Sequence, residues 1–123
     1  MTETAPPILL PEVLGEQSEN AEALLQLRIP EGLAYFSGHF PAVPIVPGVV
    51  QIGWAVHFAR HCFGLAHPFR QLEAVKFKEL MLPGQTPELH LQYAAEAARV
   101  RFCFRAASVE YSSGRIYFHG NPL

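Results

Sequence analysis

The sequence predicts one α+β domain in which a curved antiparallel sheet wraps around a single long helix. Three observations lead to this prediction. One helical segment is apolar on almost every face, the segments that follow it alternate between apolar and polar residues, and no second helix is available to cover the first. The sheet itself must therefore bury the helix, since an apolar helix has to pack against another layer.

Composition supports a single domain and excludes several classes of function. The chain has 123 residues, 50% of them hydrophobic, which is enough for a packed core without disulfides. We expect one domain over residues 1–123, with residues 1–20 as a loose N-terminal lead. The net charge of −2 and the scattered basic residues argue against nucleic acid as a partner. With no export signal and no apolar run long enough to span a membrane, we expect a cytoplasmic protein.

The first half of the chain contains a strand, a rigid loop and the helix. Residues 21–30 (AEALLQLRIP) suit a strand that Pro30 and Gly32 close. Residues 33–47 include three prolines spaced three apart, which predicts an ordered loop. The helix is expected from Gly48 to Phe63, buried on most sides, with Gly64 as its C-terminal stop.

The second half alternates with period two and is expected to form an antiparallel meander. Apolar and polar residues alternate most clearly in RVRFCFRA, residues 99–106. Turns are expected at residues 83–84 (Pro-Gly) and at residues 112–114 (Ser-Ser-Gly). The expected strands therefore lie within FRQLEAVKFKEL, TPELHLQYAA, RVRFCFRAASVEY and GRIYFHG.

Two segments carry a resemblance to a known family. GHFPAVPIVPGVV, residues 38–50, resembles the signature loop of the hot-dog-fold 3-hydroxyacyl-acyl-carrier-protein dehydratases, and AVKFKELMLPGQT, residues 74–86, is similar to the strand and turn that follow it there. PGVVQIGWA, residues 47–55, is also similar to the smaller dehydratases of aryl polyene clusters. The resemblance implies a hot-dog fold and dehydration of a 3-hydroxyacyl thioester to a trans-2-enoyl thioester, in fatty acid or polyene-type biosynthesis.

The resemblance also implies roles for particular residues. His39 matches the family base that removes a proton beside the thioester carbonyl, which suits an imidazole near neutral pKa. Gly48 matches the residue whose backbone N–H polarises that carbonyl at a helix N-terminus. The expected substrate contacts are Phe40, Pro47, Val49, Gly53 and Trp54.

One position departs from the family pattern. Gly53 stands where the family keeps a Glu or Asp that protonates the departing hydroxyl. His57, four residues on and so on the same helical face, is a candidate substitute donor, and His61 continues that face. The alternative for both histidines is an ordinary structural role, and for Trp54 a place in the core. Gln51 is expected at a dimer face or in the active site, and Glu73 is a carboxylate that could fill the space beside Gly53.

The resemblance implies partners as well. The substrate would arrive on an acyl carrier protein, which is acidic, so Arg60, Arg70, Lys76 and Lys78 could form a basic rim for it. A homodimer is expected, and pairing with a second kind of hot-dog chain is the alternative. No cofactor is implied, and His57 with His61 has no third ligand that would indicate a metal.

Two other functions stay open at this point. One is a catalytically degenerate hot-dog subunit that binds the acyl carrier or completes the site of a partner. The other is a hot-dog acyl thioesterase. Cys62 and Cys103 are expected to be small buried side chains of a reducing compartment.

Overall fold

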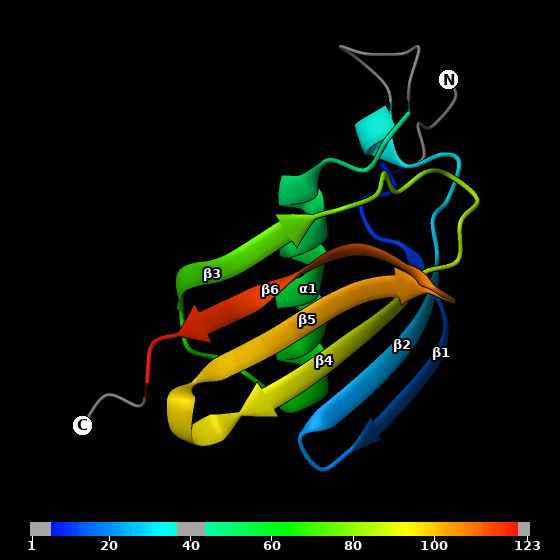
Figure 1. Cartoon of the computed structure of the whole chain (residues 1–123). Helices are drawn as coiled ribbons and strands as arrows, with labels where there is room; N and C mark the ends of the chain where they lie inside the picture. The colour runs from blue at the N-terminus through cyan, green and yellow to red at the C-terminus, as the bar shows by residue number, and fades with distance from the viewer. Residues whose placement is uncertain (1–5, 37–43, 121–123) are drawn as a thin grey trace.

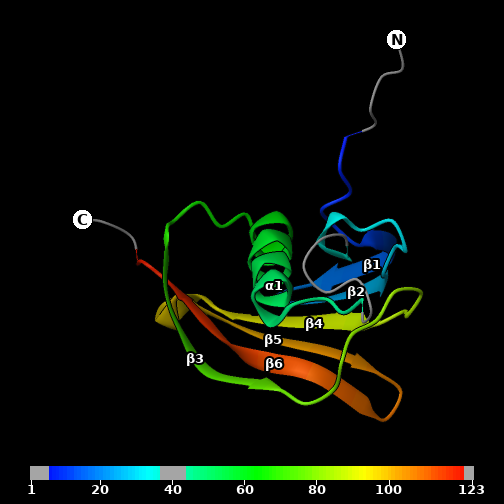
Figure 2. The same ribbon diagram turned by 90° about the horizontal axis from the view of Figure 1, so that it is seen from above.

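The computed structural model describes residues 6–36 and 44–120 and shows, within them, one α-helix held against the inner face of one sheet (Figure 1), besides two short 3-10 helices, Ala34–Phe36 and Ala95–Ala97. The six strands pair antiparallel throughout, in the order β1-β2-β4-β5-β6-β3. Seen from above, the sheet curves around helix α1 (Gly48–Phe63), as Figure 2 shows. The predicted fold class is thereby confirmed. The strands are β1 (Glu12–Glu19), β2 (Glu22–Arg28), β3 (Phe69–Phe77), β4 (Glu88–Ala94), β5 (Arg99–Ala106) and β6 (Val109–Phe118).

Helix α1 has the bounds that the sequence predicts. Pro47 precedes it with φ −59°, and Gly64 ends it in the left-handed conformation at φ 64°, which a glycine adopts at little cost. Arg60 closes the C-terminal end, because its Nη1 donates to the carbonyl oxygens of Leu65 at 3.2 Å and His67 at 2.8 Å. Within the described residues no helix is long and apolar enough to cross a membrane.

The N-terminal part is more ordered than the sequence suggested. Strand β2 confirms the strand predicted over residues 21–30, but residues 12–19 form β1 and pair with it along its length. The expectation of a loose lead over residues 1–20 is therefore wrong for β1. The sequence of β1, EVLGEQSE, does not alternate between apolar and polar residues, because this edge strand is exposed along nearly its whole length.

The C-terminal part differs from the prediction in two ways. β4, β5 and β6 form the expected meander, but β3 crosses to the far edge and pairs with β6 instead of β4. Residues 83–84 form the predicted turn. The turn expected at residues 112–114 is wrong, because these residues lie inside β6 and the reversal occurs at residues 107–108, where Ala107 has φ 51°.

The Ser-Ser-Gly sequence inside β6 has a packing reason. A Cβ on Gly114 would lie 2.8 Å from the ring of Phe102 on the neighbouring strand, so only glycine fits beneath that ring. Ser112 is buried, and its hydroxyl donates to Gln51 Oε1 of the helix at 2.6 Å. Residues that are typical of turns in sequence are here selected by contacts across the core.

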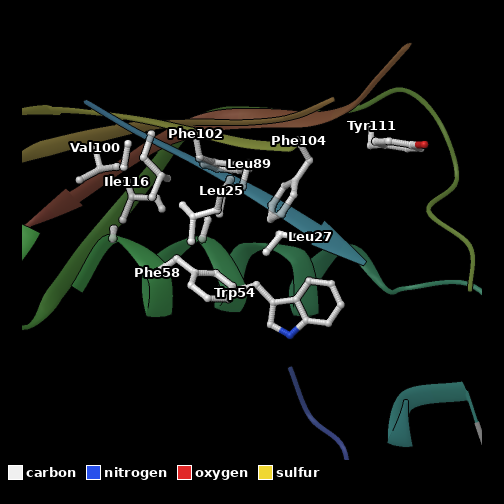
Figure 3. Close-up of a cluster of buried hydrophobic side chains, with 14 of the residues drawn as sticks. Leu25, Leu27, Trp54, Phe58, Leu89, Val100, Phe102, Phe104, Tyr111 and Ile116 are labelled. Atoms are coloured by element: carbon white, nitrogen blue, oxygen red, sulfur yellow. The ribbon is translucent and has the colours of Figure 1, made fainter. Parts of the chain in front are cut away.

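The core lies between the sheet and the inner face of α1. Trp54 and Phe58 of the helix belong to the same buried cluster as apolar side chains of β2, β4, β5 and β6, several of which Figure 3 labels. Phe104 and Ile116 are fully buried. This single cluster continues along the strands and fixes the helix on the sheet. Its strand members include Leu25, Leu27, Leu89, Leu91, Val100, Phe102, Phe104, Ile116 and Phe118.

Candidate active site at the N-terminus of helix α1

The N-terminus of α1 presents backbone N–H groups without acceptors. Pro47 has no side chain that could cap the helix, and its carbonyl oxygen accepts from the N–H groups of Val50 at 3.0 Å and Gln51 at 3.1 Å. The N–H groups of Gly48 and Val49 have no acceptor in the part of the chain that the structure describes. The first turn carries no acidic side chain, so the positive end of the helix dipole is not neutralised there. This end of the helix can therefore bind a developing negative charge.

Gly48 lies flat against an aromatic ring. A Cβ at this position would come within 2.7 Å of the Phe77 ring, which stands at the end of β3 and is about half exposed. Any side chain on residue 48 would push the ring aside. Phe77 thus forms one wall beside the free N–H groups, a role that the sequence analysis did not assign to it. The only sequence signal for this role was that Phe77 lies within AVKFKEL, part of the segment that resembles the family's strand and turn.

A buried polar bridge holds this end of the helix in place. Gln51 donates through Nε2 to the Val46 carbonyl oxygen at 3.1 Å and accepts from the Ser112 hydroxyl. The N–H of Val46 in turn donates to the Met81 carbonyl oxygen at 2.8 Å. Gln51 is 3% exposed, so it lies neither on an open dimer face nor at an open site. Its amide positions the segment that leads into the helix.

The outer face of α1 is open, which corrects the expectation of a helix buried on most sides. Val49 is 75% exposed, and Gly53, His57 and His61 follow it at intervals of four residues, all exposed. A Cβ on Gly53 would meet nothing within 4 Å. The sheet of one chain packs against only one side of the helix, so no layer of the described structure covers the stripe at Val49, Gly53 and His57.

The two helix histidines differ in their surroundings. His57 is exposed, and its ring makes an edge contact with the ring of Phe58 at 5.0 Å between centroids. His61 Nε2 lies 3.3 Å from Glu16 Oε1 of β1, which engages His61 in an ion pair when it is protonated. His57 is therefore the one of the two that has no ion-pair or hydrogen-bond partner among the described residues.

No carboxylate of the described residues stands beside Gly53. The chain has eleven acidic residues, all glutamates, and none of them belongs to α1. Glu73 accepts from Arg115 Nη2 at 3.3 Å and from the Tyr117 hydroxyl at 3.1 Å. These partners alternate with buried residues of β6 and so face away from the helix. Glu73 therefore does not fill the space that Gly53 leaves.

The remaining predicted contacts are placed as follows. His39 and Phe40 lie outside the described residues. Trp54 is buried, and its indole N–H donates to the Leu9 carbonyl oxygen at 2.9 Å, which places the ring in the core and not on the open stripe. Pro47, Gly48 and Val49 meet at the helix N-terminus, with Gly53 one turn further along the open face.

The expected basic rim is only partly free. Arg60 is engaged with the carbonyls at the helix end and lies 5.1 Å from the centre of the Phe118 ring. Lys78 pairs with Glu110 at 3.1 Å. Arg70 and Lys76 are exposed on β3.

The two cysteines are half-buried and unpaired. Burial raises the pKa of the Cys62 thiol, and the nearby Glu16 carboxylate adds to this effect. Burial likewise raises the pKa of the Cys103 thiol, with a further contribution from Glu110. Both therefore stay protonated near neutral pH and are poor nucleophiles.

Comparison with known proteins gives a consistent result. A family model described as ApeI-like, ApeI dehydratase, matches residues 15–115. The chain is 28% identical over 111 residues to a 3-hydroxyacyl-[acyl-carrier-protein] dehydratase FabZ of Ruminiclostridium cellulolyticum, covering 85% of this chain and 78% of the relative. It is 35% identical over 75 residues to the FabZ of Novosphingobium aromaticivorans, covering 54% of this chain and 48% of the relative, about half its length.

Solved structures agree with these sequence matches. One chain of the dehydratase heterocomplex ApeI:P from Xenorhabdus doucetiae superposes with a TM-score of 0.81 at 30% identity, covering 87% of this chain and 96% of that chain. An uncharacterized protein from Erwinia carotovora subsp. atroseptica superposes with a TM-score of 0.78 at 28% identity, covering 90% and 97%. The similarity therefore extends over nearly the whole of both solved chains.

Proposed function

This chain belongs to the ApeI-like dehydratase family, and from that premise we propose that it dehydrates 3-hydroxyacyl thioesters carried by an acyl carrier protein. The family and the hot-dog fold that the loop motif predicted are confirmed. The observation that best supports the activity is the uncapped N-terminus of α1, where the Gly48 N–H has no acceptor among the described residues. The FabZ relatives support an acyl-carrier-protein substrate.

The proposed reaction is an elimination of water. His39 takes the proton from C2, the electrons of that C–H bond form the C2=C3 double bond, and the C3 hydroxyl leaves with a proton as water. Negative charge develops on the thioester carbonyl oxygen during proton removal. The Gly48 N–H stabilises that charge, helped by the helix dipole. The product is a trans-2-enoyl thioester on the same carrier.

The proton for the departing hydroxyl needs a donor. Gly53 has no side chain, and the described residues place no carboxylate beside it. Within this chain His57 is the proposed donor, because it is exposed and lies one helical turn from Gly53 on the same face. The competing source is a carboxylate that a second chain brings to the open face of α1.

A second hot-dog chain is the proposed partner at this face. The stripe is exposed, and β3 is an edge strand of the sheet whose Phe69 and Phe77 are also exposed. Unpaired edges and exposed aromatic side chains favour association. A homodimer is expected from the resemblance, and the Xenorhabdus heterocomplex supports a heteromeric pairing as the alternative.

The activity is tested by incubating the purified chain with 3-hydroxyacyl carrier proteins of several chain lengths. Mass spectrometry of the carrier detects the enoyl product as a loss of water. We expect His39→Ala to abolish it, while His119→Ala, which changes an exposed histidine after β6, has no effect. Release of free acid would instead identify a thioesterase.

A second candidate function follows from Gly53. A subunit without its own acid could complete the site of a partner and be inactive alone. In that case the chain forms no enoyl product until Gly53→Glu is introduced or a catalytically complete hot-dog chain is added. If neither treatment yields product from any substrate, the dehydratase proposal fails.

A further inference from the structure

The outer face of the sheet carries a hollow that the dehydratase site does not use. Its volume is about 320 Å³, and it lies over the middle strands. The lining side chains alternate along β5 and β6 with buried core residues, so they face away from α1, which covers the other side of the sheet (Figure 2). The charged and polar members of the lining are Lys76, His90, Gln92, Arg101, Glu110, Ser113 and Arg115.

Two arginines stand directly opposite each other in this hollow. Arg101 of β5 and Arg115 of β6 are partners in the strand register. Like charges at such positions repel and destabilise a sheet. Arg115 is balanced by Glu73 at 3.3 Å, but Arg101 has no hydrogen-bond or ion-pair partner among the residues that the structure describes. The pair therefore leaves a net positive charge at the hollow.

Arg115 also has an unused donor. Its Nε atom is buried and has no hydrogen-bond partner in the described part of the chain. A buried guanidinium N–H without an acceptor is costly, so an acceptor at this point would stabilise the protein. An anion would accept a hydrogen bond from the Arg115 Nε–H group and would offset the positive charge of the two arginines.

A bulge in β3 places a third cation, the side chain of Lys76, in the lining of the hollow. β3 bulges between Glu73 and Lys76, where Ala74 has a positive φ of 53° that is unusual for a residue with a side chain. Beyond the bulge Lys76 pairs with Ser113, so both belong to the outer face together with Glu73. Bulges commonly redirect a side chain in this way. Here the bulge brings Lys76 into the lining of the hollow.

The only carboxylate of the lining is already neutralised. Glu110 lies 3.1 Å from Lys78 Nζ and accepts weaker hydrogen bonds from Ser113 and Cys103. The hydrogen bond from Lys78 holds its pKa below the usual value. Glu110 therefore does not balance Arg101 or Lys76.

We propose that this hollow is an anion site that binds a phosphate group, either free phosphate or the phosphate of a small organic ester. A guanidinium matches phosphate oxygens with two parallel N–H donors, which favours phosphate over a monovalent ion such as chloride. Lys76 supplies a further charged donor beside it, whereas the Gln92 amide already donates to Glu22 at 2.8 Å and the Ser113 hydroxyl to Glu110 at 3.4 Å. The volume leaves room for an organic body beside the phosphate, since small-ligand pockets begin at roughly 300 Å³.

Isothermal titration of the full chain with inorganic phosphate and with glycerol 3-phosphate tests the proposal. We expect saturable binding of at least one probe, and the tighter of the two identifies the source of the phosphate. Arg101→Gln should weaken binding about tenfold or more, since it removes a charged donor. Arg105→Gln is the matched control, because it removes the same charge from the same strand outside the hollow, and it should change binding by less than about twofold.

Thermal unfolding separates a binding role from a structural one. In anion-free buffer Arg101→Gln should melt at the same or a higher temperature than the unaltered chain, because it removes a like-charge pair. Phosphate should raise the melting temperature of the unaltered chain and not that of the variant. The proposal is overturned if neither probe binds at about 10 mM, well above the Kd of a millimolar site. It is equally overturned if Arg101→Gln binds as well as the unaltered chain.

Discussion

The two faces of helix α1 differ in their packing within one chain, because the inner face is buried against the sheet and the outer face is exposed. The inner face packs Trp54, Ala55, Phe58 and Ala59 against the sheet and leaves them at most 5% exposed. The outer face, with Val49, Gly53 and His57, meets no layer of the described structure. A single chain therefore supplies a whole core but only one side of the candidate site. Stability and activity should respond to different faces of the same helix.

The sharpest test compares two adjacent residues. Phe58→Ala should lower the free energy of unfolding by about 3–5 kcal/mol, because it leaves a cavity in the core. His57→Ala should change it by less than about 0.5 kcal/mol, because the side chain is exposed. Denaturant unfolding monitored by circular dichroism measures both.

The same pair distinguishes the roles in catalysis. If His57 donates the proton to the departing hydroxyl, His57→Ala lowers kcat while the protein stays folded. A large loss of stability in His57→Ala would contradict the open outer face, and would place this residue in a packed environment.

A smaller effect is expected at the bridge between the helix and β6. Ser112→Ala should cost about 1–3 kcal/mol, since it leaves the buried Gln51 Oε1 without its donor. Ser113→Ala is the matched control on the outer face of the sheet, the face that points away from α1. The Ser113 hydroxyl makes only a 3.4 Å contact with Glu110, so its loss should cost less than about 0.5 kcal/mol. Equal losses from the two variants would mean that the bridge contributes nothing specific.

The smallest effect concerns the two glycines of the helix. Gly53→Ala should stabilise the chain by about 0.5–1 kcal/mol, because alanine favours the helix and its Cβ meets no atom within 4 Å. Gly48→Ala should not give this gain, because its Cβ would collide with the Phe77 ring. Melting temperatures of the two variants measure the difference.

A double variant checks the cause assigned to Gly48. If the collision with Phe77 cancels the gain, then Gly48→Ala should be more favourable in a Phe77→Ala background than in the unaltered chain. Additive effects of the two substitutions would show that the ring is not what excludes a side chain at residue 48.

Local sequence signals predicted the elements that depend on neighbouring residues. The helix begins after Pro47 and ends at Gly64 as expected, because a proline and a glycine at these positions act on their own stretch of backbone. The turn at residues 112–114 was predicted wrongly for the opposite reason. Gly114 is required by the Phe102 ring and Ser112 by Gln51, and both contacts come from other elements.

The features of the candidate site fall into the same two groups, those that the local sequence predicted and those that contacts between distant segments determine. The family, the fold and the helix N-terminus with Gly48 followed from one contiguous motif, whose residues lie next to each other in the chain. The motif did not predict three other features. These are the place of Phe77 beside Gly48, the place of Glu73 on the outer face of the sheet, and the exposed stripe of α1. Each of these depends on which strand pairs with which, and β3 reaches its place only by crossing to the edge of the sheet.

The sequence by itself determined the class of fold, the extent of the central helix and the family, because hydrophobic periodicity, proline, glycine and a compact loop motif act over short distances along the chain. Only the tertiary structure decided which face of α1 stays open and that Gln51 is an internal bridge. It also decided that Arg101 and Arg115 meet across two strands. These outcomes depend on strand order and register, which arise from packing between distant segments.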